Sequence, residues 1–320
     1  MAIYTQLTQE DFASISQAFG LGRVIEARLI PQGSINTNAF LACERGRFFL
    51  RHTTVRSGDD LRFEAELLAH LHESRFPAPV MLRTREGLPF VERAGGRACV
   101  FSYVAGEELT RASFTPEHAE ALGRQLGKLH RVAQSFSGRR QNPYGQATVR
   151  AWLQELSRHP NTELVPLAGE LLGYLEKAVA FDRGLAPRGV IHADLFMDNV
   201  KWLGSRVSAF IDFEMACFDE WALDVAVTLN AWCFDGRYLK AHAKGLVRGY
   251  VEERPFVAVE HQALFAQALF GAVRFAASRI RDFHLSPLPP DKLARKDFRT
   301  YLSRARALAA MGPDGFGALL

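Results

Sequence analysis

The sequence predicts an α+β protein with two lobes: a small antiparallel β-sheet lobe over residues 1–104, and a larger, mainly helical lobe over residues 105–320. Two observations predict this fold class. Short β-prone runs, separated by glycine and polar residues, fill most of the first hundred positions. Beyond them, apolar residues recur at helical spacing in long segments. A chain of 320 residues is long enough to bury a sizeable core.

The amino-terminal lobe is expected to be a small sheet that carries one main helix, preceded by a short one. The short helix lies in LTQEDFASISQAFGL, where Gly20 and Gly22 end it. The runs VIEARLIPQ, NAFLACE and RFFLRHT are typical of antiparallel strands joined by hairpins. In DDLRFEAELLAHLHES, Leu61, Leu68 and Leu71 lie on one side of an amphipathic helix. PAPVMLRT, PFVER and ACVFSYV resume the strand pattern.

The carboxy-terminal lobe is expected to be helical around a few short strands. Helical periodicity runs through PEHAEALGRQLGKLHRVAQSF, VRAWLQELSRH, PLAGELLGYLEKAVAFD and ALFAQALFGAVRFAASRIRDF. Between these helices, VKWL and VSAFID flank GSR, which predicts a hairpin. A linker near residues 100–107 joins the lobes, and Gly106 would allow the chain to turn there.

Composition argues against several classes of protein. The net charge of +4 comes from dispersed lysines and arginines, which argues against a nucleic-acid partner. No uninterrupted apolar run approaches the ~20 residues of a membrane span, and the amino terminus lacks the pattern of a signal peptide. Cys43, Cys99, Cys217 and Cys233 have no CxxC spacing, which argues against zinc and disulfides. We expect a soluble, cytoplasmic protein without a membrane partner, either a monomer or a homodimer.

One acid-rich stretch carries the strongest functional pattern. In GVIHADLFMDNV, His192, Asp194 and Asn199 have the spacing H-x-D-x-x-x-x-N, and Asp212 follows thirteen residues after Asn199 at a strand end. Phosphoryl transfer to a hydroxyl needs a carboxylate at that hydroxyl, and an amide and a carboxylate that hold Mg²⁺ on the phosphates. The hairpin predicted between Asn199 and Asp212 would bring these two metal ligands back to the same edge of the site. A loop whose acids are only capped or hydrogen-bonded is the alternative, and the full spacing disfavours it.

These segments resemble a known family. HADLFMDN with IDFEMA is similar to the catalytic loop and metal site of the aminoglycoside phosphotransferase and choline kinase superfamily, which has a protein-kinase-like fold. MAIYT, GSINTNAF, DVAVTLNAWCF and VRFAASRIRDF are weak signals singly, but together they resemble the homoserine kinase branch. The resemblance runs almost end to end. It implies that residues 1–104 form a nucleotide-binding lobe and residues 105–320 a catalytic and substrate-binding lobe.

The resemblance assigns roles within the acidic stretch. Asp194 would be the catalytic base toward the acceptor hydroxyl, and Asn199 and Asp212 would hold Mg²⁺. His192 would support the loop rather than carry a proton. Asp224 would brace the catalytic loop through hydrogen bonds, although an acid at a helix N-terminus is also favoured by the helix dipole.

The nucleotide side departs from the kinase pattern at two places. No G-x-G-x-x-G motif precedes the first hairpin, so a turn with one glycine would present backbone N–H groups and short polar side chains to the phosphates; its residues are Gly33, Ser34, Asn36 and Asn38. The strand position that usually holds a lysine carries Arg51, whose planar fork differs from an ammonium. Glu64 is its expected partner, with Glu66 second. An exposed strand arginine is the alternative.

Two further regions complete the expected site. CVFSYVAGEEL resembles the hinge, where backbone groups from Phe101 to Tyr103 would bind adenine; a plain strand end would explain the same letters. In the acceptor site, either Arg274 or Arg279 would bind a carboxylate, while the other pairs with Asp282 or Glu214; internal ion pairs alone are the alternative. The remaining acceptor candidates are Asp198 and Asn230 for an ammonium group, Glu214 as an unassigned acid, and Trp232 as a wall or a core residue.

The sequence therefore predicts an ATP- and Mg²⁺-dependent kinase that phosphorylates L-homoserine in threonine biosynthesis. The first alternative is a related kinase for an aminoglycoside, choline, ethanolamine or a sugar. The basic carboxy-terminal segment DKLARKDFRTYLSRARAL argues against a polycationic aminoglycoside. The second alternative is a nucleotide-binding pseudokinase, which the missing lysine favours and the intact Asp194, Asn199 and Asp212 disfavour.

Overall fold

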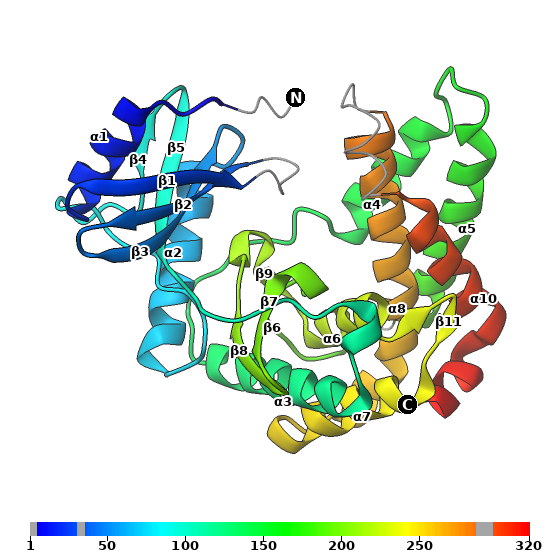
Figure 1. Ribbon diagram of the computed structural model, residues 1–320. Helices are drawn as coiled ribbons and strands as arrows, with labels where there is room; N and C mark the ends of the chain where they lie inside the picture. Colours follow the sequence, from blue (N-terminus) through cyan, green and yellow to red (C-terminus); the bar gives the residue numbers. More distant parts are fainter. Residues whose placement is uncertain (1–4, 31–35, 183, 286–296) are drawn as a thin grey trace. The chain divides into compact units, whose positions relative to one another are not determined.

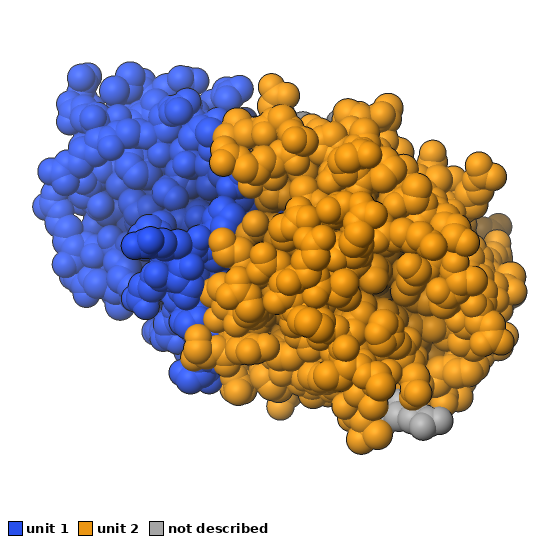
Figure 2. All heavy atoms as spheres, turned by 90° about the horizontal axis from the view of Figure 1, so that it is seen from below, with its two compact units in different colours: residues 1–106, 136–138, 208–214 blue, residues 107–135, 139–207, 215–320 orange. Residues whose placement is uncertain are grey.

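The computed structural model describes residues 5–30, 36–182, 184–285 and 297–320. The chain forms two compact units. Unit 1 contains residues 1–106, 136–138 and 208–214, and unit 2 contains residues 107–135, 139–207 and 215–320 (Figure 2). The continuous part of unit 1 ends at Gly106, two residues beyond the end of the lobe predicted from the sequence. The sequence division did not anticipate that residues 208–214, with Asp212, belong to unit 1.

Unit 1 is built on a five-stranded antiparallel sheet (Figure 1). Its strand order is β1-β2-β3-β5-β4, with β1 Val24–Ile30, β2 Thr37–Cys43, β3 Gly46–Thr53, β4 Val91–Arg93 and β5 Gly96–Ser102. Burial alternates along β2, as expected for a strand with one face on a core. The register pairs Arg51 with Asn38 on one side and with Cys99 on the other. The sheet therefore brings the β1–β2 turn region and the Arg51 strand together.

Two helices accompany this sheet, α1 Gln9–Phe19 and α2 Gly58–Glu73. Each begins at a capping box, Thr8 with Asp11 and Ser57 with Asp60, which satisfies backbone N–H groups that the first turn leaves free. Gly20 ends α1 at φ 66°, as its position in the sequence predicts.

The strand predicted for PAPVMLRT is wrong. Only an isolated bridge joins Met81 to Phe101 there. Pro77 and Pro79 remove two N–H donors from the segment, and proline is poorly tolerated inside a sheet.

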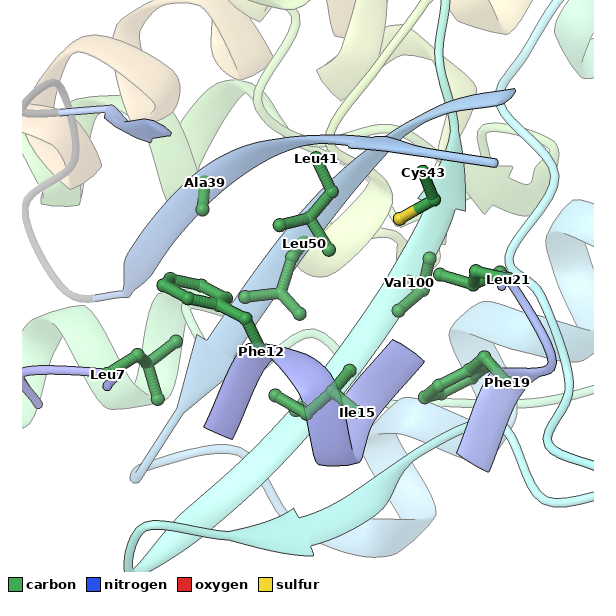
Figure 3. Close-up of a cluster of buried hydrophobic side chains, with 11 residues drawn as sticks. Leu7, Phe12, Ile15, Phe19, Leu21, Ala39, Leu41, Cys43, Leu50 and Val100 are labelled. Carbon is green, nitrogen blue, oxygen red and sulfur yellow. The ribbon is translucent and has the colours of Figure 1, made fainter. Parts of the chain in front are cut away.

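The core of unit 1 lies between α1 and the sheet. Phe12, Ile15 and Phe19 project from α1 toward a sheet face that includes Leu41 and Val100 (Figure 3). All five side chains are at least nine-tenths buried, and each contributes about 1.5–3 kcal/mol through removal of apolar surface from water. This packing holds the sheet that carries Arg51.

Unit 2 is mainly helical. Its α-helices are α3 Pro116–Ala133, α4 Gln146–Leu156, α5 Leu164–Phe181, α6 Trp221–Trp232, α7 Lys240–Glu253, α8 Ala258–Arg279 and α10 Arg299–Leu319. The α8 segment is long and apolar enough to cross a membrane, but 89% of its apolar window is buried within the protein. Its composition is explained by its place as a core helix packed against α5, α6 and α10.

Helices α3 and α7 approach closely because glycines line their contact. A Cβ atom added at Gly123 would collide with the carbonyl oxygen of Leu246, and one added at Gly249 would collide with the carbonyl oxygen of Glu120. Any larger residue at these positions would force the two helices apart.

Short strands support the acidic stretch. β6 Arg188–Ile191 pairs antiparallel with β9 Cys217–Glu220, and β7 Val200–Leu203 pairs with β8 Arg206–Phe210. The hairpin predicted around GSR is confirmed, with Gly204 in the left-handed region at φ 59°. β10 Phe234–Asp235 and β11 Arg237–Tyr238 form a small ribbon, and the 3₁₀ turns are η1 Arg111–Ser113, η2 Met197–Asn199 and η3 Phe213–Met215. A π-helical turn, η4 Ile280–His284, follows α8. All four cysteines are free and buried.

Candidate active site

The acidic loop of unit 2 follows strand β6, whose last three residues are buried. The loop brings Asp194 and Asn199 together: the Asn199 amide donates to the Asp194 carbonyl oxygen at 2.8 Å and to its carboxylate at 3.4 Å. Asn199 is 8% exposed, whereas Asp194 is partly open. Because the amide nitrogen is occupied by Asp194, the amide oxygen remains as the group that Asn199 can offer to a metal.

Asp224, in the first turn of α6, holds this loop by its backbone. Its carboxylate accepts the N–H of His192 at 2.7 Å and the N–H of Ala193 at 2.8 Å. Ala193 has φ 65°, a conformation that costs a non-glycine residue energy. Burial alone would raise the pKa of Asp224, but the hydrogen bonds that it accepts from the His130 ring and the His192 backbone act in the opposite direction, and the pKa is lowered. Asp224 is thus an ionised acceptor that fixes the turn before Asp194.

A buried network reaches Asp224 from helices α3 and α7, and the sequence interpretation missed it. His130 donates from Nε2 to Asp224 at 3.0 Å, and Tyr250 donates to His130 Nδ1 at 2.8 Å. Arg254 donates to both Tyr250 and Glu260. Burial lowers the pKa of His130, so its ring is neutral at pH 7 and carries its proton toward Asp224. The only sequence signal was a histidine on an otherwise apolar helix face.

Two residues predicted for the acceptor site instead support the loop. Trp232 is fully buried, and its indole N–H donates to the carbonyl of Leu195 at 2.8 Å. Arg274 is 1% exposed and donates to the carbonyl of Ala193 at 2.9 Å. Within the described residues Arg274 makes no ion pair, so the predicted pairing with Asp282 or Glu214 is wrong for this arginine. A backbone carbonyl and the neighbouring ring of Phe275, 4.6 Å away, take its place.

Asn230 is also a structural residue. It is fully buried, its amide donates to the carbonyl of Ala268 at 2.8 Å, and its oxygen accepts from the Tyr238 hydroxyl. Both ends of the side chain are occupied by the protein. The prediction that it meets a substrate ammonium group is therefore wrong.

Arg279 has a more open position. Its guanidinium donates to the carbonyl of Asp297 at 3.1 Å and to the Thr300 hydroxyl at 2.7 Å, and it lies 4.5 Å from the ring centre of Tyr301. Burial lowers its pKa, and Asp194 and Asp198 act on it electrostatically in the opposite direction. Asp282, the predicted alternative partner, pairs with Arg281 at 2.6 Å instead. Asp198 is exposed.

In unit 1, Arg51 and Glu64 form the predicted pair. Two nitrogens of Arg51 donate to the two oxygens of Glu64 at 2.7 and 3.1 Å, and the two side chains are 5% and 1% exposed. The ring of Phe101 lies 4.7 Å from the guanidinium. Burial alone would lower the pKa of Arg51, but Glu64, Asp212 and Glu214 together raise it well above its usual value. The alternative of an exposed strand arginine is wrong.

Glu214 joins the same group of residues. It accepts from Arg51 at 3.2 Å and from the Asn36 amide at 2.7 Å, and its backbone carbonyl accepts from Arg56. The Asp212 carboxylate lies 3.8 Å from Arg51 and is 43% exposed. Unit 1 therefore gathers an arginine and an asparagine around the two acids of the IDFE segment.

The remaining nucleotide-site predictions have mixed outcomes. Gly33 and Ser34 lie outside the described residues. Asn38 lies on β2 directly across from Arg51. At the expected hinge, the backbone N–H groups of Ser102 and Tyr103 donate to the carbonyls of Val80 and Arg47. These two N–H groups are therefore engaged within the sheet, which argues against their use for adenine.

The two predicted metal ligands lie in different units, Asn199 in unit 2 and Asp212 in unit 1. The amide oxygen of Asn199 and the carboxylate of Asp212 are each hard oxygen donors of the kind that Mg²⁺ prefers. Among the described residues, no group of three or more His, Cys, Asp or Glu side chains could hold a metal.

Comparison with known proteins identifies the family. The model of the phosphotransferase enzyme family, APH, matches residues 26–256. The chain belongs to this family. This phosphotransferase is 36% identical over 312 residues to the homoserine kinase of Brucella anthropi, which covers 96% of this chain and 94% of the relative. It is 33% identical over 304 residues to the homoserine kinase of Bartonella henselae, with 93% of each chain covered.

Solved structures agree on the fold of this phosphotransferase. Amicoumacin kinase hAmiN, in complex with AMP-PNP, Ca²⁺ and Ami, is similar with a TM-score of 0.75 at 16% identity over 94% of each chain. A spectinomycin phosphotransferase in complex with ADP and spectinomycin gives 0.69 at 12% identity, covering 97% of this chain and 98% of the other. The kinase-like fold predicted from the resemblance is confirmed.

Proposed function

We propose that this phosphotransferase transfers the γ-phosphoryl group of ATP to the hydroxyl of L-homoserine, with Mg²⁺ as the metal, and so acts in threonine biosynthesis. The observation that carries the proposal is the near-full-length identity of 36% to a homoserine kinase. The site chemistry is consistent with it, because Asp194 is partly open in a loop whose backbone is held at several points. A cytoplasmic location remains part of the prediction.

Asp194 would accept the proton of the acceptor hydroxyl. The hydroxyl oxygen would then bond to the γ-phosphorus as the bond from that phosphorus to the β,γ-bridging oxygen breaks, which releases ADP. Asn199 donates to Asp194, and this hydrogen bond would hold the carboxylate in one orientation. Base catalysis of this kind contributes roughly 10²–10⁴ in rate.

Asn199 and Asp212 would hold Mg²⁺. The chemistry that Mg²⁺ would supply there is positive charge to offset the charge that develops on the phosphates. Arg51 would be the cation on the phosphates, in place of the usual lysine, and Glu64 would orient it. Asn36 would add an amide donor. The pairing of a strand cation with a helix glutamate favours a working kinase over a pseudokinase, since this ion pair is part of the active kinase arrangement.

The acceptor would be recognised by opposite charges. Arg279 is the candidate for the carboxylate of homoserine, because its guanidinium is partly exposed and Asp194 acts on it electrostatically. Asp198, which is exposed, is the candidate for the ammonium group. Arg274 would act on the acceptor only through the loop that it supports.

The direct test is ADP release by the purified protein with ATP and Mg²⁺ against a panel of L-homoserine, choline, ethanolamine and aminoglycosides. The expected result is release with homoserine that far exceeds release with the other acceptors. Omission of Mg²⁺ should abolish it. ADP release with another acceptor but not with homoserine would support kinase activity and reject homoserine as the substrate. Release with none would reject the kinase proposal for these acceptors.

A further inference from the structure

Unit 2 contains a cavity of about 710 Å³ that the proposed reaction does not use. Residues from the β6–β9 ladder, the end of α5, the start of α4 and the face of α8 line it. Arg188 and Glu220 lie at one end of the ladder, and Ile191 and Cys217 at the other, next to the catalytic loop. At about 3.3 Å per residue, the two ends of β6 are roughly 10 Å apart. Asp194 is not among the residues that line the cavity.

Glu220 is the buried acid of this cavity. The residue is 3% exposed, and its Oε2 accepts from the Gln267 amide at 2.8 Å. Among the described residues, no donor reaches its Oε1. The same Gln267 nitrogen donates to Asp182 at 3.2 Å, so one amide serves two carboxylates. Burial first, and then the charge of Asp182, raise the pKa of Glu220 to about 7. Glu220 is short of hydrogen-bond donors.

Arg188 is the partly open cation of the same cavity. It is the direct cross-strand partner of Glu220 in the ladder, where opposite side chains lie close together. The described structure nevertheless contains no ion pair between them. Arg188 donates to Asp219 at 3.0 Å through one nitrogen, and its side chain is 49% exposed. A cationic and an anionic side chain therefore line one cavity as cross-strand neighbours, without an ion pair between them among the described residues.

The lining of the cavity as a whole also contains positive and negative side chains in equal number. Its charged residues are three arginines and three acids: Arg139, Arg140, Arg188, Asp182, Asp219 and Glu220. The rings of Phe218 and Phe270 also line it. A lining with equal numbers of both signs disfavours a multiply charged anion such as a nucleotide, and it disfavours a polycation equally. It favours a ligand with one charge of each sign and an apolar part.

We propose that this cavity is a second ligand site, which binds a small zwitterion of the α-amino acid class. The ammonium group donates to the Oε1 atom of Glu220, and the carboxylate accepts from the guanidinium of Arg188. The side chain of the ligand lies toward Phe218 and Phe270. The proposal concerns binding and does not depend on which acceptor the kinase uses.

The test is isothermal titration calorimetry on the full-length protein without ATP, with three probes that share one side chain. L-Valine carries both charges, L-valinamide only the positive one, and 3-methylbutyrate only the negative one. We expect saturable binding of L-valine alone. If L-valinamide bound as tightly as L-valine, the cavity would be a site for amines. If 3-methylbutyrate bound as tightly as L-valine, it would be a site for anions. Either result, or no binding of L-valine, would overturn the proposal.

Variants assign the binding to this cavity. Glu220→Gln keeps the shape but removes the charge, and Arg188→Gln removes the charge of a half-exposed side chain. Each should raise the dissociation constant for valine by ~10-fold or more, the equivalent of one charged hydrogen bond. Glu155→Gln, the same change at an exposed residue outside the cavity, is the matched control. Asp194→Asn should leave valine binding intact. Loss of binding in Asp194→Asn but not in the cavity variants would locate valine in the acceptor site and refute the proposal.

The pH dependence gives an independent check. The groups that act on Glu220 are Asp182 and Asp219, which raise its pKa, and Arg188, which lowers it. As the pH rises through about 7, Glu220 loses its proton and gains the charge that attracts an ammonium group. Valine should therefore bind more tightly at about pH 8 than at about pH 6, and Glu220→Gln should remove this difference. A flat profile in the unmodified protein would contradict the role of Glu220.

Discussion

Replacing Asp224 by asparagine tests how the catalytic loop is held. The carboxylate accepts three donors, at 2.7 Å from His192, 2.8 Å from Ala193 and 3.0 Å from His130. An asparagine side chain has nearly the same shape but only one acceptor oxygen, and its NH₂ group is a donor. At least one of the three N–H groups would then face another donor in a fully buried place.

The expected loss follows from these contacts. A hydrogen bond to a charged group is worth about 1.5–3 kcal/mol, and a buried donor without a partner costs a similar amount. We expect Asp224→Asn to lower the free energy of unfolding by about 3 kcal/mol. Turnover should fall by roughly 10²-fold, because a displacement of about 1 Å at the reacting group has that effect.

The assay is urea unfolding followed by circular dichroism, together with ADP release. The low pKa of Asp224 in the folded state means that its stabilisation is present above the unfolded pKa of about 3.9 and is lost as the pH falls through the folded value. The stability difference between the two proteins should therefore shrink in acid. Asp235→Asn, the same change at an exposed position, is the control. Normal stability and normal turnover in Asp224→Asn would refute the reasoning, and reduced stability with normal turnover would limit Asp224 to a structural role.

Three further predictions follow from the site and the fold. Asp194→Asn should reduce turnover by ~10² or more while ATP still binds, as measured by ADP release and nucleotide titration; near-normal turnover would remove Asp194 from the base role. Arg51→Ala leaves Glu64 as an unpaired buried carboxylate, so the free energy of unfolding should fall by about 3–5 kcal/mol, and less for Arg51→Lys; equal stability of all three proteins would contradict the ion pair. Gly123→Ala should lower the free energy of unfolding by ~1–3 kcal/mol through the clash with α7, whereas Gly169→Ala, with open space around it, should not destabilise; equal effects would contradict the close approach.

The parts of the site that sequence could predict are those encoded by short spacings. Asp194 and Asn199 are five residues apart, and one loop conformation brings them into contact. Glu64 was predicted as the partner of Arg51, ahead of Glu66, because the resemblance implies that the strand cation pairs with a glutamate of the next helix. The alternation along β2 and the glycine after α1 are equally local signals.

The parts that sequence could not predict depend on distant contacts. His130 and Asp224 are 94 residues apart, and His130 and Tyr250 are 120 residues apart, so no local pattern relates them. Arg274 was expected to meet a carboxylate because a charged group on an apolar helix requires a partner, and Trp232 was left open between a pocket wall and a core residue. The partners are backbone carbonyls of the catalytic loop, and a carbonyl has no signature in the sequence. The need of Arg274 for a partner was predicted correctly, but the partner is a backbone carbonyl and not a carboxylate of the protein.

The contacts of Asp224 have a consequence for how new substrates can arise on this fold. Asp224, Trp232 and Arg274 all bind the main chain of the loop, so these three contacts do not depend on which side chains the loop carries. A change at Phe196 or Asp198 can reshape the surface offered to an acceptor while the turn before Asp194 keeps its form. Substitutions at these two positions would therefore alter the surface of the loop without altering the position of the Asp194 carboxylate.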